Sequence, residues 1–317
     1  MRHLTLVLTL PLRLEPVLDA VRRHAPSLMS LLRRGRALDV GDEGLSALCC
    51  EVLGVIRQQD WPVAPLTARA DGLASSEGYW LRLDPAHLEV GMGGLMLRPA
   101  DELGLSAAEA ADLAASLAAL GMELYTPVPT RWYLRLPAPP DLITTPLDRV
   151  AGEYLSAHLP QGRDAGRLMA RVNEAQMLLH DHPANQDRER RGLAAVNGLW
   201  LWGGGELPRP AEQSVVVASD VGQVQVLARA LGAKTRPTPG NAIDLDTDPS
   251  ADWLVVLTPG ENDASLEELL VRLERTWFHP LLVRLRFGRV RRLALHLMAR
   301  PGQSVAVDAV AAWRFWR

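Results

Sequence analysis

The chain has 317 residues, of which 48% are apolar and 22% are charged, and its formal net charge is -3. This length and composition supply enough apolar surface for one large or two modest folded domains. The small negative charge, with arginines spread along the chain, excludes a general attraction to nucleic acid or to anionic membranes. No window approaches the roughly 20 apolar residues of a membrane span, so we expect a cytoplasmic protein.

The first residues predict a strand followed by a helix. Residues 4–10 alternate in the manner of a strand, and residues 15–36 carry apolar side chains at helical spacing until Gly35. The apolar start imitates a signal peptide, but Pro11 and Arg13 interrupt it and no small-x-small cleavage site follows. We therefore interpret it as the first strand of a sheet.

The only two cysteines, Cys49 and Cys50, are adjacent in a run that reads as a helix. Neighbouring residues of a helix point about 100° apart and do not easily form a disulfide, so we expect two small side chains that face the core. The following segment, residues 57–78, is polar and rich in proline and glycine, which is typical of a crossing between domains.

A second set of elements follows this crossing. Residues 79–90 predict a strand and a turn, and Ser106 with Glu109 forms the capping-box pattern at the start of a helix to residue 120. Residues 137–146 hold four prolines and predict an extended linker. The remaining predicted elements are strands 123–125 and 131–136, helix 164–180 stopped by Pro183, strands 198–202 and 215–218, helix 221–231, strand 253–257, helix 264–286, and strands 293–298 and 305–307.

The segment 178–205 is the most informative part of the chain. A run of the form His-Pro-x-Asn-x-x-Arg begins at His182, and a Leu-Trp strand end with three glycines follows it. This segment resembles the one that, in archaeal-type 2,3-bisphosphoglycerate-independent phosphoglycerate mutases of the alkaline phosphatase superfamily, leads from the inserted domain back to the catalytic sheet. An Arg-x-Asp-Pro-x-His-Leu run at Arg82 and a Leu-Ser-x-x-Glu-Ala run at Leu105 are similar to patterns of the same mutases. The chain also resembles bacterial phosphoglycerate-mutase-like regulatory proteins associated with pathogenicity factors.

The resemblance implies an α/β fold of the alkaline-phosphatase type, with a mainly parallel sheet flanked by helices and a small inserted α+β domain. The alternation of predicted strands and helices independently favours a parallel sheet covered by helices. We place the first part of the α/β core at residues 1–75, the inserted domain at 76–192 and the second part of the core at 193–317.

The resemblance also implies where metal chemistry would lie. In the superfamily two divalent metals clamp a phosphoryl group while a serine or threonine attacks it, and aspartates and histidines after core strands hold the metals. Here the first strand runs into Pro11 and Arg13 instead of an Asp-Gly pair, residues 254–265 contain no histidine, and no Asp-His pair follows Val290. We therefore expect no bound cofactor, or manganese if the enzyme reading holds.

No nucleophile or metal-ligand set stands out among the residues that remain. Ser46, Ser75 and Ser76 lie in the third of the chain where the resemblance places a nucleophile. No set of metal-ligand residues lies near them in the sequence. His180 and His182 offer imidazoles, but neighbouring ligands at a helix end rarely converge on one metal. The weak metal candidates are thus His180, His182 and Asp263, with Glu261 beside the last of these.

An anion site is the chemistry that the sequence still supports. Arginines present fork-shaped sets of donors that suit carboxylate and phosphate groups, and a run of glycines exposes main-chain N–H groups. A solvated helix end and a plain turn are the structural alternatives for these two features. The candidates are Asn185, Arg188, Arg190 and Arg191, the glycines Gly203, Gly204 and Gly205, and Asp148, for which helix capping is an alternative.

Three hypotheses follow. The leading one is a phosphoglycerate-mutase-like protein that lacks the metal ligands and the nucleophile, and that regulates or binds a small phosphorylated or carboxylated metabolite. The alternative is a divalent-metal-dependent phosphotransferase or phosphatase of the mutase type that uses unconventional ligands. The third is an interaction protein with a protein partner, for which the aromatic residues at 313, 315 and 316 form either a sticky patch or a core edge strand.

Overall fold

The strand that opens the chain lies inside a seven-stranded sheet. The computed structural model describes residues 1, 3–39, 41, 43–209, 214–247, 251–260 and 263–313. In it β1 (His3–Arg13) pairs in parallel with both β10 and β11, so segments from the two ends of the chain form one sheet. The strand order is β2 (Arg36–Ala37), β12 (Gln303–Asp308), β11 (Arg292–Arg300), β1, β10 (Asp252–Leu257), β8 (Val215–Ala218) and β9 (Lys234–Arg236), with β2 and β12 antiparallel to their neighbours.

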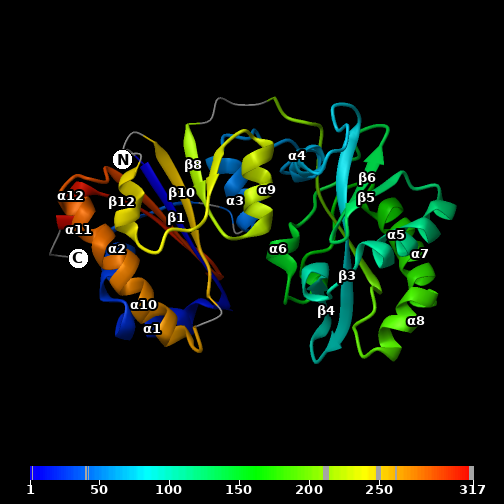
Figure 1. Cartoon of the computed structure of the whole chain (residues 1–317), viewed down its shortest axis with the longest axis horizontal. Helices are drawn as coiled ribbons and strands as arrows, with labels where there is room; N and C mark the ends of the chain where they lie inside the picture. Colours follow the sequence, from blue (N-terminus) through cyan, green and yellow to red (C-terminus); the bar gives the residue numbers. More distant parts are fainter. Residues whose placement is uncertain are drawn as a thin grey trace. The chain divides into compact units, whose positions relative to one another are not determined.

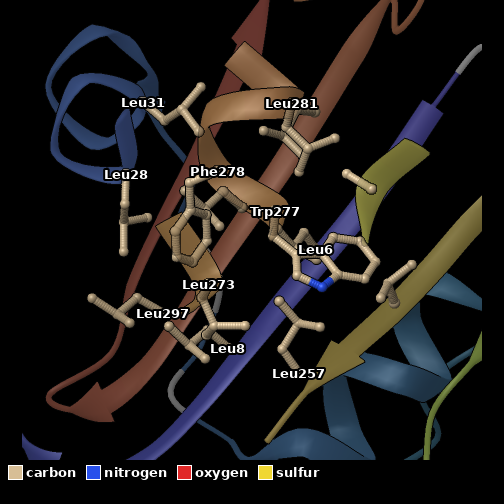
Figure 2. Packing of buried hydrophobic residues seen from close by; sticks show 14 of the residues in the cluster. Leu6, Leu8, Leu28, Leu31, Leu257, Leu273, Trp277, Phe278, Leu281 and Leu297 are labelled. Atoms are coloured by element: carbon tan, nitrogen blue, oxygen red, sulfur yellow. The ribbon is translucent and has the colours of Figure 1, made fainter. Parts of the chain in front are cut away.

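Helices pack against this sheet, and alternate leucines of β1 contact them. Leu6 and Leu8 point at a helical layer that includes Leu28 and Leu31 of α2 and the aromatic pair at Trp277, as Figure 2 shows. All of these side chains are almost completely buried, because alternate residues of a strand share one face. The helices of this unit are α1 (Leu14–His24), α2 (Pro26–Arg34), α9 (Gly222–Ala230), α10 (Leu266–Leu273), α11 (His279–Arg286) and α12 (Ala309–Trp313).

Two predicted long helices are interrupted in the structure. Residues 15–36 form α1 and α2, which meet at Ala25 because Pro26 lacks an N–H and starts a new helix instead of continuing the old one. Residues 264–286 form α10 and α11 with a π-helical segment, Glu274–Phe278, between them. For the aromatic residues at 313, 315 and 316, read from sequence as either a core edge strand or a sticky patch, the structure shows Trp313 at the end of helix α12, while residues 314–317 lie outside the described part.

A second, antiparallel sheet is built around the long strand β3 (Tyr79–Gly91) (Figure 1). This strand pairs with β4, β6 and β7, and β6 pairs with β5. The partner strands are β4 (Gly94–Pro99), β5 (Leu124–Val128), β6 (Arg131–Leu136) and β7 (Gly198–Gly205). The helices of this part are α3 (Leu45–Val52), α4 (Val63–Ala70), α5 (Ala107–Leu117), α6 (Leu147–Val150), α7 (Ala165–His180) and α8 (Pro183–Arg190).

Local signals explain where most of these helices begin and end. The Ser106 side chain accepts from the N–H of Glu109 while Glu109 accepts from the N–H of Ser106, which is the predicted capping box of α5. Helix α7 ends before Pro183 as predicted, but the same proline also occupies the first turn of α8, which the sequence pattern did not indicate. Short 3-10 helices complete the chain at Ala100–Glu102, Ala118–Leu120, Leu155–Ala157 and Ala242–Thr247.

The chain divides into two units that are each described by themselves. Unit 1 consists of residues 1–42 and 212–317 and holds the mainly parallel sheet, while unit 2 consists of residues 43–211 and holds the antiparallel sheet. The boundaries predicted from sequence, 75/76 and 192/193, differ from these because α4 and β7 pack with strand β3 of the antiparallel sheet and α3 contacts α6 of the same unit. Among the described residues, no helix combines the length and the apolar composition needed to cross a membrane.

Candidate functional site

The Arg-x-Asp motif of β3 forms a buried ion pair at the centre of unit 2. Nε of Arg82 lies 2.9 Å from one carboxylate oxygen of Asp84, and Nη2 lies 2.8 Å from the other. Both side chains are almost fully excluded from solvent, at 2% and 0% exposure. Such a pair requires further hydrogen bonds, because two desolvated charges rarely repay their hydration by mutual attraction alone.

The surrounding strands supply those further contacts. Asp84 also accepts from the indole N–H of Trp202 at 2.7 Å and from the main-chain N–H of Trp132 at 3.2 Å. The guanidinium carbon of Arg82 lies 5.1 Å and 5.3 Å from the ring centres of Trp202 and Tyr133, within cation–π range. Burial raises the pKa of Asp84, and the Arg82 guanidinium opposes that rise. The pair therefore ties β3 to β6 and β7 inside the unit.

The rest of this motif joins β3 to the segment that precedes β7. Nδ1 of His87 lies 2.8 Å from the carbonyl oxygen of Ala195. The Asn197 side chain accepts from the N–H of Leu88 at 2.7 Å and donates to the carbonyl of Leu88 at 3.0 Å. An amide side chain that satisfies both main-chain groups of one residue acts like an additional rung of the sheet.

Asn185, a candidate for anion binding, is 1% exposed and bound to main-chain groups. Its amide nitrogen donates to the carbonyls of Leu179 and Val196 at 2.7 and 2.9 Å, and its oxygen accepts from the N–H of Val196 at 2.8 Å. The side chain thus joins the end of α7 to the start of the β7 segment. It presents no group to a ligand.

Arg188 is also enclosed, with no exposed side-chain surface. Its Nε donates to the carbonyl of Ala194 at 2.9 Å and Nη2 donates to the carbonyl of Leu103 at 2.6 Å. Nη1 lies 3.1 Å from a carboxylate oxygen of Glu109, the capping-box residue of α5. The guanidinium therefore joins α8, α5 and the loop at Leu103, with hydrogen bonds from Nε and Nη2 and a charge contact from Nη1, and none of it is exposed to solvent.

The two neighbouring arginines are exposed but already paired. Arg190 lies 3.0 Å from Asp187, and Arg191 lies 3.3 Å from Glu109 and 3.2 Å from Asp187. The side chains of Arg190 and Arg191 are 76% and 52% exposed, so these pairs are weak and open to water. The structure thus brings the arginines together with two carboxylates and does not form a set of free cationic donors.

The three consecutive glycines at the end of β7, Gly203 to Gly205, lie in closely packed surroundings. A side chain on Gly204 would meet the Tyr79 hydroxyl at 2.5 Å, and one on Gly205 would meet Pro62 at the same distance. Gly203 has a φ of +68°, which side chains rarely adopt, and its N–H donates to the Thr144 hydroxyl at 3.1 Å. All three residues are buried, so the glycine run serves strand packing and not an open anion nest.

Asp148 lies at the beginning of another helix, α6. One of its carboxylate oxygens accepts from the N–H of Ser46 at 2.6 Å, in the first turn of α3. Burial raises the pKa of Asp148, and the hydrogen bond from Ser46 opposes the rise. Capping of α3 therefore accounts for this carboxylate, and Ser46 itself is only 1% exposed.

A second buried carboxylate, Asp60, was not predicted from sequence. Its oxygens accept from the N–H of Thr144 at 3.0 Å and 3.2 Å and from the hydroxyl of the same residue. Burial raises the pKa of Asp60 to about 6, and the hydrogen bonds from Thr144 oppose the rise. Asp60 thereby holds the extended segment 143–145 against β7, where Thr145 accepts from the indole of Trp200. A lone aspartate in a polar loop gave no signal for this role.

Two of the weak metal candidates, His182 and Asp263, form local hydrogen bonds. Nδ1 of His182 accepts from the N–H of Ala184 and caps α8, while the exposed His180 ends α7. Asp263 binds Arg272 through two contacts of 2.9 and 2.6 Å and also accepts from the N–H of Gly260. Glu261 lies outside the described residues.

The described residues do not fit a pair of divalent metals. After β8 the Ser219 hydroxyl accepts from the N–H of Val221, and Asp220 accepts from the N–H of Thr238. Across the described ranges, no three His, Cys, Asp or Glu side chains gather closely enough to hold a metal ion. A divalent metal prefers several such ligands, and two adjacent metals need more.

Sequence comparison relates the chain to known enzymes over part of its length. It is 36% identical over 106 residues to a 2,3-bisphosphoglycerate-independent phosphoglycerate mutase of Methanothrix thermoacetophila, which covers 33% of this chain and 27% of that protein. It is 36% identical over 70 residues to a probable mutase of the same type from Geobacter sulfurreducens, which covers 22% of this chain and 18% of that protein. The match thus spans under a third of either relative. No family model matches the chain.

Solved structures extend the likeness to nearly the whole chain. The PH0037 protein from Pyrococcus horikoshii has a TM-score of 0.51 at 15% identity and covers 97% of this chain and 87% of its own. A cofactor-independent phosphoglycerate mutase from Thermoplasma acidophilum has a TM-score of 0.44 at 16% identity, over 97% and 90% of the two chains. The likeness to the PH0037 protein confirms the α/β fold class predicted from sequence, and the partial sequence matches are to phosphoglycerate mutases of the 2,3-bisphosphoglycerate-independent type.

Proposed function

We propose that this chain is a non-catalytic relative of the cofactor-independent phosphoglycerate mutases, which acts in regulation by binding. The observation that carries the proposal is the use of its motif residues. Arg82, Asp84, Asn185 and Arg188 all direct their polar atoms at other groups of unit 2. The likeness to the mutases thus rests on residues that hold a scaffold together, and a scaffold can outlast its chemistry.

The ends of the parallel strands also support this proposal. In a sheet of this kind ligands and metals collect at the carboxyl ends of the strands. Here the acidic side chains described after β8 and β10, Asp220 and Asp263, accept from main-chain N–H groups, and Asp263 is paired with Arg272 as well. An active member needs such carboxylates free for metal.

The alternative is a metal-dependent phosphotransferase that uses Asp263, His180 and His182. It would have to break the two contacts between Asp263 and Arg272 and the cap that His182 gives α8. Breaking a cap alone costs about 1 kcal/mol, and the ion pair adds to that cost. The observed contacts therefore favour the non-catalytic proposal.

The test is an assay of 3-phosphoglycerate isomerisation with manganese, using the Methanothrix thermoacetophila mutase as the positive control. We expect this chain to show no conversion above a protein-free blank that contains manganese. Conversion that scales with protein concentration and disappears in Asp263→Asn would overturn the proposal in favour of the alternative. Conversion that persists in Asp263→Asn would overturn both this proposal and that choice of ligands.

A thermal-shift titration tests the binding of a small anion separately. A ligand at about 100 times its dissociation constant stabilises a fold by roughly 2.7 kcal/mol. Because Arg188 is enclosed and Arg190 and Arg191 are already paired, we expect 3-phosphoglycerate to leave the melting temperature unchanged at moderate salt. A saturable rise that is lost in the double variant Arg190→Ala, Arg191→Ala would instead assign the anion site to these exposed arginines.

A further inference from the structure

Unit 2 contains a pocket of about 330 Å³ whose lining includes none of the candidate anion or metal residues. Leu155, Leu199 and Leu201 are buried residues of its lining, and Leu95 and Leu159 lie where the pocket meets solvent. The last two are 45% and 49% exposed, which leaves apolar surface uncovered at the mouth. Small-molecule sites have volumes of roughly 300 to 1,000 Å³ and mostly apolar walls, so this pocket is of the right size and character.

The lining contains no charged residue. A charged ligand that entered would lose hydration without gaining a counter-charge, and that loss costs several kcal/mol. The pocket therefore selects against phosphates and carboxylates, which are the ligands that the resemblance to mutases suggests. It selects for an uncharged molecule.

Three neutral polar side chains border the apolar walls. Asn173 and Gln176 come from α7, three residues apart and thus on the same side of the helix, and Ser156 comes from the short helix Leu155–Ala157. Within the described part of the chain, none of the three side chains is hydrogen-bonded to another residue. Two amides and a hydroxyl can both donate and accept, which suits an amide, carbonyl or hydroxyl group of a ligand.

The strand β7 contributes main-chain atoms to the same wall. Leu199, Trp200 and Leu201 all line the pocket, although consecutive strand residues point to opposite faces. The wall there consequently includes the edge of the strand, where main-chain N–H and C=O groups lie. Among the described strands, β7 pairs only with β3, so its second edge carries no strand.

We propose that this pocket binds an uncharged small molecule with an apolar body, such as an acyl chain or an aromatic ring, and one neutral hydrogen-bonding end. The apolar body lies against the leucines, and the polar end meets Asn173, Gln176 and Ser156. The inference goes beyond the proposed function and is independent of it, because the pocket lies within unit 2 and shares no residue with the strand ends of unit 1.

The test compares octanamide with octanoate, which has the same chain length but carries a charge, and adds 1-naphthamide as a neutral aromatic probe. The full chain, labelled with ¹³C at the methionine methyl groups, is titrated with octanamide, 1-naphthamide and octanoate. Met169 lines the pocket and reports binding, whereas Met29 lies in unit 1 and serves as the internal control. We expect the Met169 signal to shift saturably with at least one neutral amide, and at least tenfold more weakly with octanoate, while Met29 stays unchanged.

A matched pair of variants on α7 distinguishes binding in the pocket from nonspecific hydrophobic binding to the protein surface. Asn173→Trp places a large side chain in the lining, and Met177→Trp places the same side chain at a position that is 73% exposed and outside the lining. We expect Asn173→Trp to abolish the amide-induced shift and Met177→Trp to retain it. The inference is overturned if neither amide binds, if octanoate binds as tightly as octanamide, or if Asn173→Trp leaves binding unchanged.

Discussion

Arg188 and Arg190 are two residues apart in the sequence, and their surroundings are opposite. Arg188 has no exposed side-chain surface and reaches two carbonyls and a carboxylate, whereas Arg190 is 76% exposed and contacts Asp187 and the carbonyl of the neighbouring Gln186. Hydrogen bonds from a buried cation are among the stronger contacts in a protein, while an exposed ion pair contributes almost nothing. The surroundings of Arg188 are those of a structural residue, whereas only Arg190 is exposed enough to reach a ligand.

We predict that Arg188→Ala lowers the free energy of unfolding by about 3 kcal/mol, because it leaves the carbonyls of Leu103 and Ala194 without their donor and removes the buried cation beside Glu109. Arg190→Ala should change it by less than about 0.5 kcal/mol. Urea denaturation followed by circular dichroism measures both. Equal effects of the two substitutions would contradict the structural role of Arg188.

The sequence indicated that Arg188 mattered but not what it binds. A cluster of arginines beside an asparagine is typical of anion sites, and the same residues suit carbonyl clamps equally well. The deciding partner, the carbonyl of Leu103, is 85 residues away in the chain. Main-chain carbonyls carry no sequence signature, so only the folded structure could separate the two interpretations.

At the scale of elements, β7 packs closely against its neighbours because its glycines have no side chains. Its glycines let α4 and Tyr79 approach the main chain closely, with Gly204 lying under the tyrosine hydroxyl. Added atoms in a packed interior force neighbours to shift, which typically costs about 1–3 kcal/mol. The same glycine run suggested an anion nest in the sequence.

We predict that Gly204→Ala lowers the free energy of unfolding by about 2 kcal/mol, and that the cost becomes smaller in a Tyr79→Phe background, which removes the closest atom. Gly166→Ala in α7 is the matched control, since a methyl group there meets nothing within 4 Å and should stabilise the helix by about 0.5–1 kcal/mol. A double-mutant cycle by chemical denaturation measures the coupling. Identical costs in both backgrounds would show that Tyr79 is not the obstacle.

Periodicity predicted most elements, and proline explains two of the misses. Nine of the strands and helices α5, α7 and α9 follow their apolar patterns, whereas β2, β4 and β9 were not predicted. Pro183 ends one helix and also begins the next, and Pro26 divides a predicted single helix, because a residue without an N–H suits only a first turn. Helix α4, within residues 57–78, was predicted as loop since Pro62 just before it and Pro65 in its first turn resemble turn signals.

On the scale of the whole molecule, the two units carry buried groups with opposite responses to acid. Asp60 in unit 2 has a pKa of about 6, because burial disfavours its charge. His296 in unit 1 has a pKa of about 4, also because of burial, and its Nδ1 lies 2.9 Å from the Ser304 hydroxyl. In both cases the folded state favours the neutral form, which is protonated for the acid and deprotonated for the base.

We predict that acidification from pH 7 to pH 4 stabilises unit 2 through Asp60. The folded carboxyl takes up a proton near pH 6 while the unfolded one does so near pH 3.8, so the free energy of unfolding rises by up to about 3 kcal/mol as pH falls through this window. Asp60→Asn should remove this dependence. Hydrogen exchange of peptides from residues 43–209 measures it, and an unchanged pH slope in the variant would contradict the assignment.

The opposite is expected for unit 1 through His296. The unfolded imidazole is protonated near pH 6.5 and the folded one only near pH 4, so the free energy of unfolding falls by up to about 3 kcal/mol as pH falls between these values. His296→Gln should flatten this loss. Hydrogen exchange of peptides from β11 and β12 reports it, and a variant that still loses protection with acid would show that another group is responsible.

The central position of β1 also orders events during synthesis on the ribosome. Leu4 pairs with Trp253 on one side and with Leu293 on the other, so β1 has neither of these partners until β10 and β11 have been translated. Every strand of unit 2 lies within residues 43–211 and is available earlier. The apolar residues of β1, which are buried in the folded protein, therefore stay without their partner strands while unit 2 can already fold, and this interval is when β1 is most prone to aggregate.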